Sequence, residues 1–115
     1  MEDKIKFFKV LSDSNRLRIL KMLQAKPLCV CEITYVLELA ASTVSQHLKI
    51  LKENGFIIEE KDGKWVNYLI NPRPIDTRIT TLLSSLDYWI ADESIIIADK
   101  MKVINSDRNT ICNKL

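Results

Sequence analysis

A β-hairpin signal in a mainly helical sequence constrains the fold more than any other feature of this chain. Residues 56–60 and 65–70 are rich in β-branched and aromatic residues, and Asp62-Gly63 lies between them at the position of a tight turn. Before and after this region, apolar residues recur at three- and four-residue steps, which is typical of amphipathic helices. The sequence therefore predicts a mainly α (α+β) fold with a two-stranded hairpin.

Four helices are predicted before the hairpin. Residues 12–15 offer several N-caps for the second helix, and Pro27 follows its end. The third helix is expected to begin near Cys29, and Ser42 is expected to cap a fourth helix that ends before Gly55. A helix pair followed directly by a compact hairpin is the arrangement of a winged helix-turn-helix domain, in which the hairpin is the wing.

The predicted fourth helix has one apolar and one polar face. On a helical wheel, Val44 and Leu48 fall on one side, and Gln46 and Lys49 fall on the other. A short polar face suits a helix in the DNA major groove, where glutamine can contact adenine and lysine can contact guanine or phosphate. The candidate DNA-binding residues are Ser42, Thr43, Ser45, Gln46, His47, Lys49, Arg16, Lys61 and Lys64. Further candidates for phosphate contacts are Arg18, Lys21 and Lys26, although each of these basic residues alone is more typical of a solvated surface charge.

An apolar stripe after the hairpin predicts one or two long C-terminal helices, with a break near Asp92. Such a stripe is longer than a small domain needs to cover its core. Pairing with a second copy is the simplest use for it, which gives a homodimer with a long C-terminal dimerisation helix. We therefore expect a DNA-binding and dimerisation domain over residues 1–91, and a helical extension with a polar tail over residues 92–115.

The bulk composition limits the classes of partner and the cellular location. The net charge is only +2, so a DNA-binding surface must come from a local concentration of basic residues. No apolar run approaches the roughly 18 residues of a membrane-spanning helix, and the charged N-terminus lacks the apolar core of a signal peptide. We expect a cytoplasmic protein that does not enter the membrane.

The sequence resembles the ArsR/SmtB family of metal- and metalloid-responsive repressors over nearly all of residues 4–91. The matching stretches are residues 11–20, 28–33 and 42–49, together with Gly63 and Tyr68 of the hairpin. The resemblance implies a homodimer joined by its first and last helices, in which the fourth helix reads duplex operator DNA. It also implies a repressor that leaves the operator when an inducer binds, and no catalytic activity.

The cysteines are the candidate inducer site. Cys29 and Cys31 lie at the predicted start of the third helix, where amide groups and the helix dipole favour the thiolate that binds soft ions. The resemblance identifies this pair with the site for As(III) or Sb(III) in arsenical-resistance repressors, so we expect one of these as inducer and no organic cofactor. A third cysteine of the family pattern is replaced here by Thr34. Cys112 is either a third ligand, from the same or the partner subunit, or an incidental thiol of the tail.

Several alternatives remain open for these residues. Oxidation of Cys29 with Cys31, or of one of them with Cys112, would make a redox sensor, and cadmium or lead could bind the same thiolates. A zinc site on the last helix is disfavoured because the helix offers only carboxylates and no histidine, so these are expected on a solvated face. Those carboxylates are Asp87, Asp92, Glu93 and Asp99. A thiol reductase is a further alternative, but the sequence lacks the Cys-x-x-Cys motif on a βαβ pattern that such an enzyme uses. A pure protein-interaction module is the last alternative, and it would bind no DNA.

Overall fold

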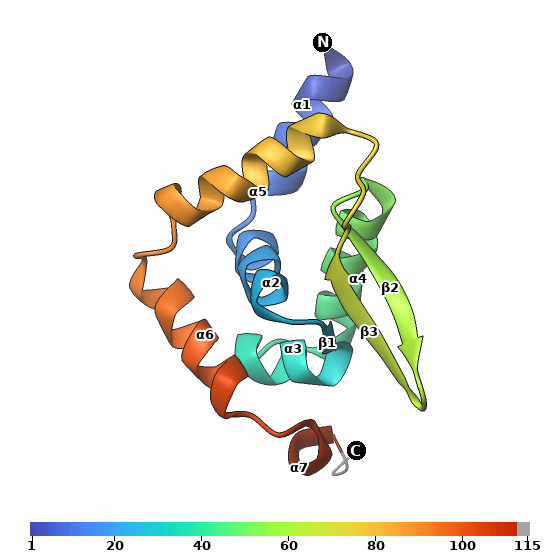
Figure 1. Cartoon of the computed structure of the whole chain (residues 1–115), viewed down its shortest axis with the longest axis vertical. Coiled ribbons are helices and arrows are strands. Elements are labelled where there is room, and N and C mark those ends of the chain that lie inside the picture. Colours follow the sequence, from blue (N-terminus) through green and yellow to red (C-terminus); the bar gives the residue numbers. More distant parts are fainter. Residues whose placement is uncertain (113–115) are drawn as a thin grey trace.

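The computed structural model describes residues 1–112, and the mainly helical fold with a hairpin is confirmed (Figure 1). The elements are α1 (Glu2–Leu11), α2 (Ser14–Ala25), β1 (Leu28–Cys29), α3 (Val30–Leu37), α4 (Ala41–Glu53), β2 (Ile57–Asp62), β3 (Trp65–Ile70), α5 (Thr77–Trp89), α6 (Ser94–Asn105) and α7 (Arg108–Cys112). Among the described residues, no helix is long and apolar enough to cross a membrane.

The helix boundaries follow local chemistry. The Asp13 carboxylate caps α2 by accepting hydrogen bonds from the backbone N–H groups of Asn15 and Arg16. The third helix begins where it was expected, with Cys29 as its N-cap. The predicted cap of the fourth helix is wrong, because α4 begins at Ala41 and Ser42 lies inside its first turn.

The core lies between the first four helices and the start of the hairpin, and buried side chains of α5 and α6 complete it. The inward face predicted for α4 is confirmed, since Val44, Leu48 and Leu51 are at most 1% exposed. They belong to one cluster with buried side chains of α2 and α3 and with Phe56 at the start of the hairpin. Burial of this apolar surface fixes α4 against α3, which leaves the opposite face of α4 for solvent.

The sheet has three strands, whereas the sequence predicted two. The additional strand is β1, which pairs antiparallel with β3 so that Cys29 lies opposite Asn67, and the strand order is β1-β3-β2. A strand of two residues has no alternating pattern that could reveal it in the sequence. Its pairing brings the start of α3 directly against the wing.

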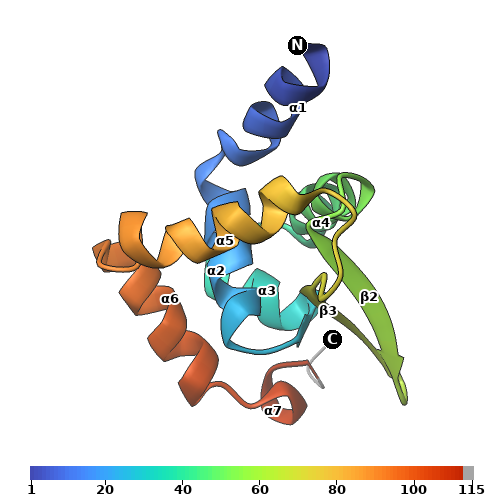
Figure 2. The ribbon, with the colours of Figure 1, turned by 45° about the horizontal axis from the view of Figure 1, so that its top comes forward.

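The C-terminal stripe forms two helices, α5 and α6, instead of one long helix, and the break falls at residues 90–93 near the predicted position. α6 packs along α2, and the chain then returns so that α7 packs on α3 (Figure 2). Residues 108–112 of the expected polar tail are therefore helical, and residues 113–115 lie outside the described part of the chain. The solvated location predicted for Asp99 is also wrong, because its side chain is 3% exposed and pairs with Arg18.

Candidate functional site

The polar face of α4 lies on the surface. Ser42, Thr43, Ser45, Gln46 and Lys49 are all exposed, and the outward face that the helical wheel predicted for Gln46 and Lys49 is confirmed. These side chains are short or flexible, and they offer hydrogen-bond donors and acceptors along one side of a 13-residue helix. The arrangement can present polar groups to base edges and phosphates, although their individual roles stay a prediction.

Arg16 and His47 take part in a network inside the protein. The Arg16 guanidinium donates to the carbonyl oxygens of Val10 (2.6 Å) and Lys9 (3.2 Å) at the end of α1. Its third contact is to Nδ1 of His47 on α4, at 3.2 Å. This network links α1, α2 and α4, so Arg16 and His47 can position the exposed face of α4. Nη1 of Arg16 also lies 3.9 Å from Asp13, and the DNA contacts of Arg16 and His47 stay a prediction.

The basic residues outside α4 differ in whether their charges are free to contact a DNA phosphate. Lys61 and Lys64 are exposed around the hairpin turn, where Gly63 adopts a φ of +60°, and Lys26 is also exposed. Arg18 and Lys21 are occupied by Asp99 and Asp87, with nitrogen–oxygen distances of 2.8 and 2.6 Å. Both are therefore poor candidates for phosphate contacts, because their charges already have partners.

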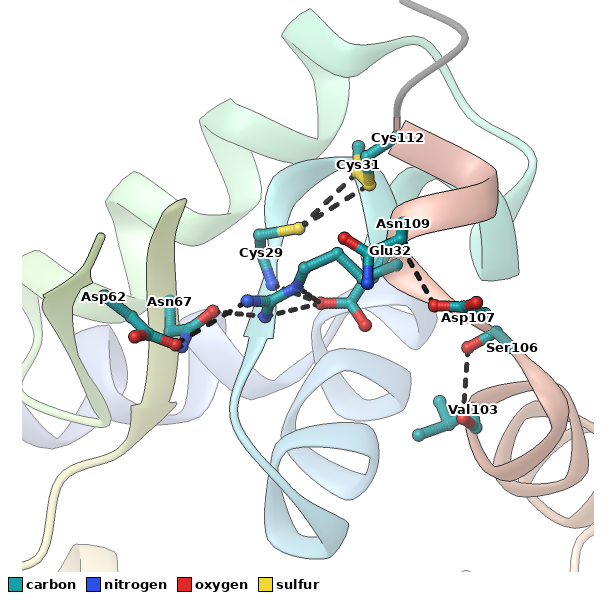
Figure 3. Close-up of polar contacts among 11 residues, drawn as sticks. Cys29, Cys31, Glu32, Asp62, Asn67, Val103, Ser106, Asp107, Asn109 and Cys112 are labelled. Carbon is teal, nitrogen blue, oxygen red and sulfur yellow. Dashed lines mark hydrogen bonds and ion pairs between the residues drawn. A yellow bond between two sulfur atoms is a disulfide. The ribbon is translucent and has the colours of Figure 1, made fainter. Parts of the chain in front are cut away.

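The three cysteines form one cluster at the start of α3 (Figure 3). Sγ of Cys29 lies 3.5 Å from Sγ of Cys31 and 3.9 Å from Sγ of Cys112, and all three sulfurs lie within 4.8 Å of one another. Cys31 and Cys112, which are 81 residues apart in sequence, are joined as a disulfide. The structure thus brings Cys112 to the predicted pair from the same chain, and Thr34 instead donates to the backbone oxygen of Val30.

Cys29 has the most constrained position of the three. It is both a residue of β1 and the N-cap of α3, where the Glu32 carboxylate accepts from its backbone N–H at 3.0 Å. Burial raises the pKa of the Cys29 thiol and outweighs the opposing effect of the Glu32 backbone N–H. The thiolate expected from the helix N-terminus is therefore not favoured before an ion binds.

The donor set suits a soft ion. Three sulfurs converge, Cys29 and Cys112 are buried, and Glu32 is the nearby carboxylate but is already paired with Arg108. Thiolates prefer soft ions such as trivalent arsenic, cadmium or lead over hard cations that need oxygen ligands. A reduced cluster could hold a three-coordinate ion in a pyramidal arrangement.

The role of two residues that support the cysteine cluster was not predicted from the sequence. Glu32 and Arg108 form an ion pair of 2.8 Å, and the Glu32 side chain is only 5% exposed. Glu32 follows Cys29 by three residues, which is the spacing of a capping box, so this pattern could have identified it. Nothing local to Arg108 points to a partner 76 residues away.

Comparison with known proteins identifies the class. The model of the bacterial regulatory protein arsR family matches residues 13–59. The arsenic resistance transcriptional regulator ArsR1 of Pseudomonas putida is 30% identical over 96 residues, which cover 80% of this chain and 75% of that protein. This chain belongs to the arsR family of bacterial regulatory proteins, and its family and fold are those of DNA-binding transcriptional regulators, not enzymes.

Two further relatives are a regulator of arsenical resistance and a regulator of cadmium resistance. The arsenical resistance operon repressor of Escherichia coli is 39% identical over 69 residues, covering 59% of each protein. The cadmium regulator CadC of Listeria innocua is 46% identical over 65 residues, covering 56% of this chain and 55% of that protein. The chain therefore matches little more than half the length of these two relatives.

A solved structure confirms the fold. The homodimeric winged helix-turn-helix DNA-binding domain of Mb0332 from Mycobacterium bovis superposes with a TM-score of 0.63 at 25% identity. The match covers 81% of this chain and 82% of that one. The winged helix-turn-helix prediction is thus confirmed, with α4 as the second helix of the motif and the β2–β3 hairpin as the wing.

Proposed function

We propose that this protein is a metalloid-responsive transcriptional repressor. A homodimer binds operator DNA through α4 and the wing, and As(III) or Sb(III) releases it by binding Cys29, Cys31 and Cys112. The observation that carries this proposal is the convergence of three sulfurs within 4.8 Å at the start of α3. The similarity to arsenic resistance regulators supports the choice of inducer.

The chemistry of binding requires the reduced cluster. Reduction of the Cys31–Cys112 disulfide gives three thiols, and the cytoplasm, where we place the protein, keeps thiols in that state. Arsenous acid then reacts with the three thiols, so that three As–S bonds replace three As–O bonds, and each departing hydroxyl group takes up a thiol proton and leaves as water. Cadmium or lead would instead displace the thiol protons.

The location of the cluster suggests how binding reaches the DNA-reading surface. Cys29 and Cys31 lie at the start of α3, which packs against α4, and Cys29 also pairs with Asn67 of the wing strand β3. An ion that binds the three sulfurs and sets their spacing therefore acts on the support of both DNA-binding elements. DNA affinity falls by the difference in ligand affinity between the DNA-bound and released conformations.

The homodimer is supported by apolar side chains that one chain leaves exposed. Phe8 of α1 is 66% exposed, and Trp89 of α5 is 64% exposed. Both line a groove between α1 and α5, and a second copy can bury this surface by symmetric pairing. The homodimeric relative from M. bovis supports the same assembly.

Fluorescence anisotropy tests the proposal. The reduced protein is titrated onto duplex DNA from its own upstream region, with and without one equivalent of arsenite. We expect tight binding that is lost with arsenite and retained when Cys29, Cys31 and Cys112 are all replaced by serine. Binding that persists in the wild-type protein contradicts the metalloid response, and parallel titrations with cadmium and lead then test the other soft ions.

A redox sensor is the second candidate function, and the Cys31–Cys112 disulfide favours it. A peroxide would oxidise the two thiols to the disulfide and be reduced itself, two molecules of water being formed from hydrogen peroxide. DNA release by peroxide, accompanied by loss of two titratable thiols, supports this function. Release by arsenite with all three thiols still recoverable afterwards supports the first.

A further inference from the structure

The geometry points to Arg108 as the positioning residue that seats Cys112 in the thiol cluster and links the cluster to the wing. This inference rests on the proposed function, because it assigns Arg108 a role in building the metalloid site. Arg108 begins α7 and Cys112 ends it, so the two residues are one helical turn apart and share a face of the helix. Once the Cys31–Cys112 disulfide is reduced, whatever holds the Arg108 side chain therefore also limits where the third sulfur can lie.

One oxygen atom of Glu32 contacts both Cys29 and Arg108, the residue that begins the helix of Cys112. Oε1 of Glu32 accepts from the backbone N–H of Cys29 at 3.0 Å, and also from Nε and Nη2 of Arg108 at 3.0 and 2.8 Å. The Glu32 side chain is 5% exposed, so the pair is shielded from water and costs more to break than a surface pair. Glu32 thus orients Cys29 directly and Cys112 through Arg108.

The same guanidinium also contacts the wing. Nη2 of Arg108 donates to Oδ1 of Asn67, and the guanidinium carbon lies 5.1 Å from the centre of the Trp65 ring. Asp62 at the hairpin turn is 3.9 Å from Nη1. These three residues belong to the β2–β3 hairpin, and Figure 3 shows Asn67 and Asp62 on the wing side of Glu32 and the cysteines. Arg108 therefore joins α3, α7 and the wing at one point.

This junction gives the metalloid site a direct route to the wing. When the reduced sulfurs rearrange around an ion, α7 moves with Cys112, and Arg108 carries that displacement to β3. The DNA-bound position of the wing in turn holds Arg108, and through it the apo position of Cys112. The route is separate from the path through α3 to α4, and it depends on a residue that binds neither the ion nor DNA.

The test compares Arg108→Gln with Arg73→Gln, which makes the same chemical change at an exposed arginine that has no side-chain ion pair among residues 1–112. The first readout is the rate at which iodoacetamide alkylates Cys112 in the reduced, metal-free protein, followed by mass spectrometry. We expect a rate about tenfold higher in Arg108→Gln, the effect of losing a charge-assisted hydrogen bond, and the wild-type rate in Arg73→Gln. A wild-type rate in both variants overturns the inference.

The second readout is arsenite affinity in a double-mutant cycle with Cys112→Ser. If Arg108 acts by seating Cys112, Arg108→Gln weakens arsenite binding about tenfold in the wild-type background and has no effect once Cys112 is serine. Equal losses in both backgrounds indicate general destabilisation and overturn the positioning role. If the wild-type protein binds no arsenite, the proposed function fails, while the alkylation rates still decide the role of Arg108.

Asn67→Ala keeps the inference falsifiable if Arg108→Gln does not fold. This variant removes a wing contact of Arg108 and leaves the Glu32 pair in place. We expect Cys112 alkylation to rise by a smaller factor than in Arg108→Gln, about threefold. A wild-type rate in Asn67→Ala overturns the link between the wing and the cluster.

Discussion

Arg18 and Asp99 join α2 to α6 through two hydrogen bonds of 2.8 Å, one to each carboxylate oxygen. The Asp99 side chain is 3% exposed and that of Arg18 is 17% exposed, so the pair lies at the boundary of the core. It fixes α6 along α2, and the position of α6 determines where the chain turns back toward α3. The ion pair therefore contributes, at a distance, to the placement of α7 and Cys112.

Replacement of Asp99 by alanine should destabilise the protein by about 3–5 kcal/mol, because it leaves the Arg18 guanidinium without its partner in a mostly buried position. Urea denaturation followed by circular dichroism measures the change. Asp87→Ala is the matched control, since Asp87 pairs with Lys21 but is 60% exposed, and its loss should cost about 1 kcal/mol or less. Equal losses for the two variants would contradict the structural importance of the Arg18–Asp99 pair.

Cys29→Ser should separate the two candidate functions. The variant lacks one sulfur of the cluster but retains the Cys31–Cys112 pair, and serine can still act as the N-cap of α3. We expect unchanged DNA affinity and no release by arsenite, measured by anisotropy. Normal release by arsenite would exclude Cys29 from the metalloid site, whereas release by peroxide alone would favour the redox function.

Gln46→Ala should relax the preference for one base pair of the operator. Gln46 is exposed on the outer face of α4, and a bidentate contact with adenine is worth about 1–3 kcal/mol. Competition binding with single-base operator variants measures the effect at each position. If the base preference is unchanged at every position, Gln46 does not read a base.

Lys64→Ala at the wing turn should weaken binding to all DNA sequences by a similar factor. If Lys64 contacts a phosphate, the slope of log affinity against log salt concentration should fall by about one unit. Titrations at several salt concentrations, with specific and nonspecific duplexes, give both quantities. Lys100→Ala is the control, because Lys100 is exposed on α6 and that helix is not part of the predicted DNA-reading surface. An equal change of the salt slope in Lys100→Ala would contradict a phosphate contact from the wing.

The local features of this fold could be predicted because they leave a periodic or capping pattern in the sequence. The burial of Val44 and Leu48, the hairpin around Gly63 and the start of α3 at Cys29 are all of this kind. Each leaves a pattern over a short stretch of sequence, where helical spacing and turn chemistry apply, even where the side chains finally pack against distant elements.

The features that were missed or left open depend on contacts between distant segments. Asp99 was placed on a solvated face because a carboxylate in a helical pattern is usually exposed, and its partner Arg18 lies 81 residues away. Cys112 could not be assigned to the cluster for the same reason, since no spacing rule joins α7 to α3. The DNA contacts and the metalloid ligands stay predictions until they are measured.

The third sulfur is supplied by α7, which lies outside residues 13–59, the part of the chain that matches the family model. Where the family pattern has a cysteine on the third helix, this chain has Thr34 and recruits Cys112 from a five-residue helix. In the proposed site, one of the three ligands is therefore encoded outside the segment that contains α4, whereas Cys29 and Cys31 lie within that segment. We therefore expect that substitutions in α7, by natural variation or by engineering a biosensor, change which ion the proposed site binds while the sequence of α4, the helix predicted to read the operator, stays the same.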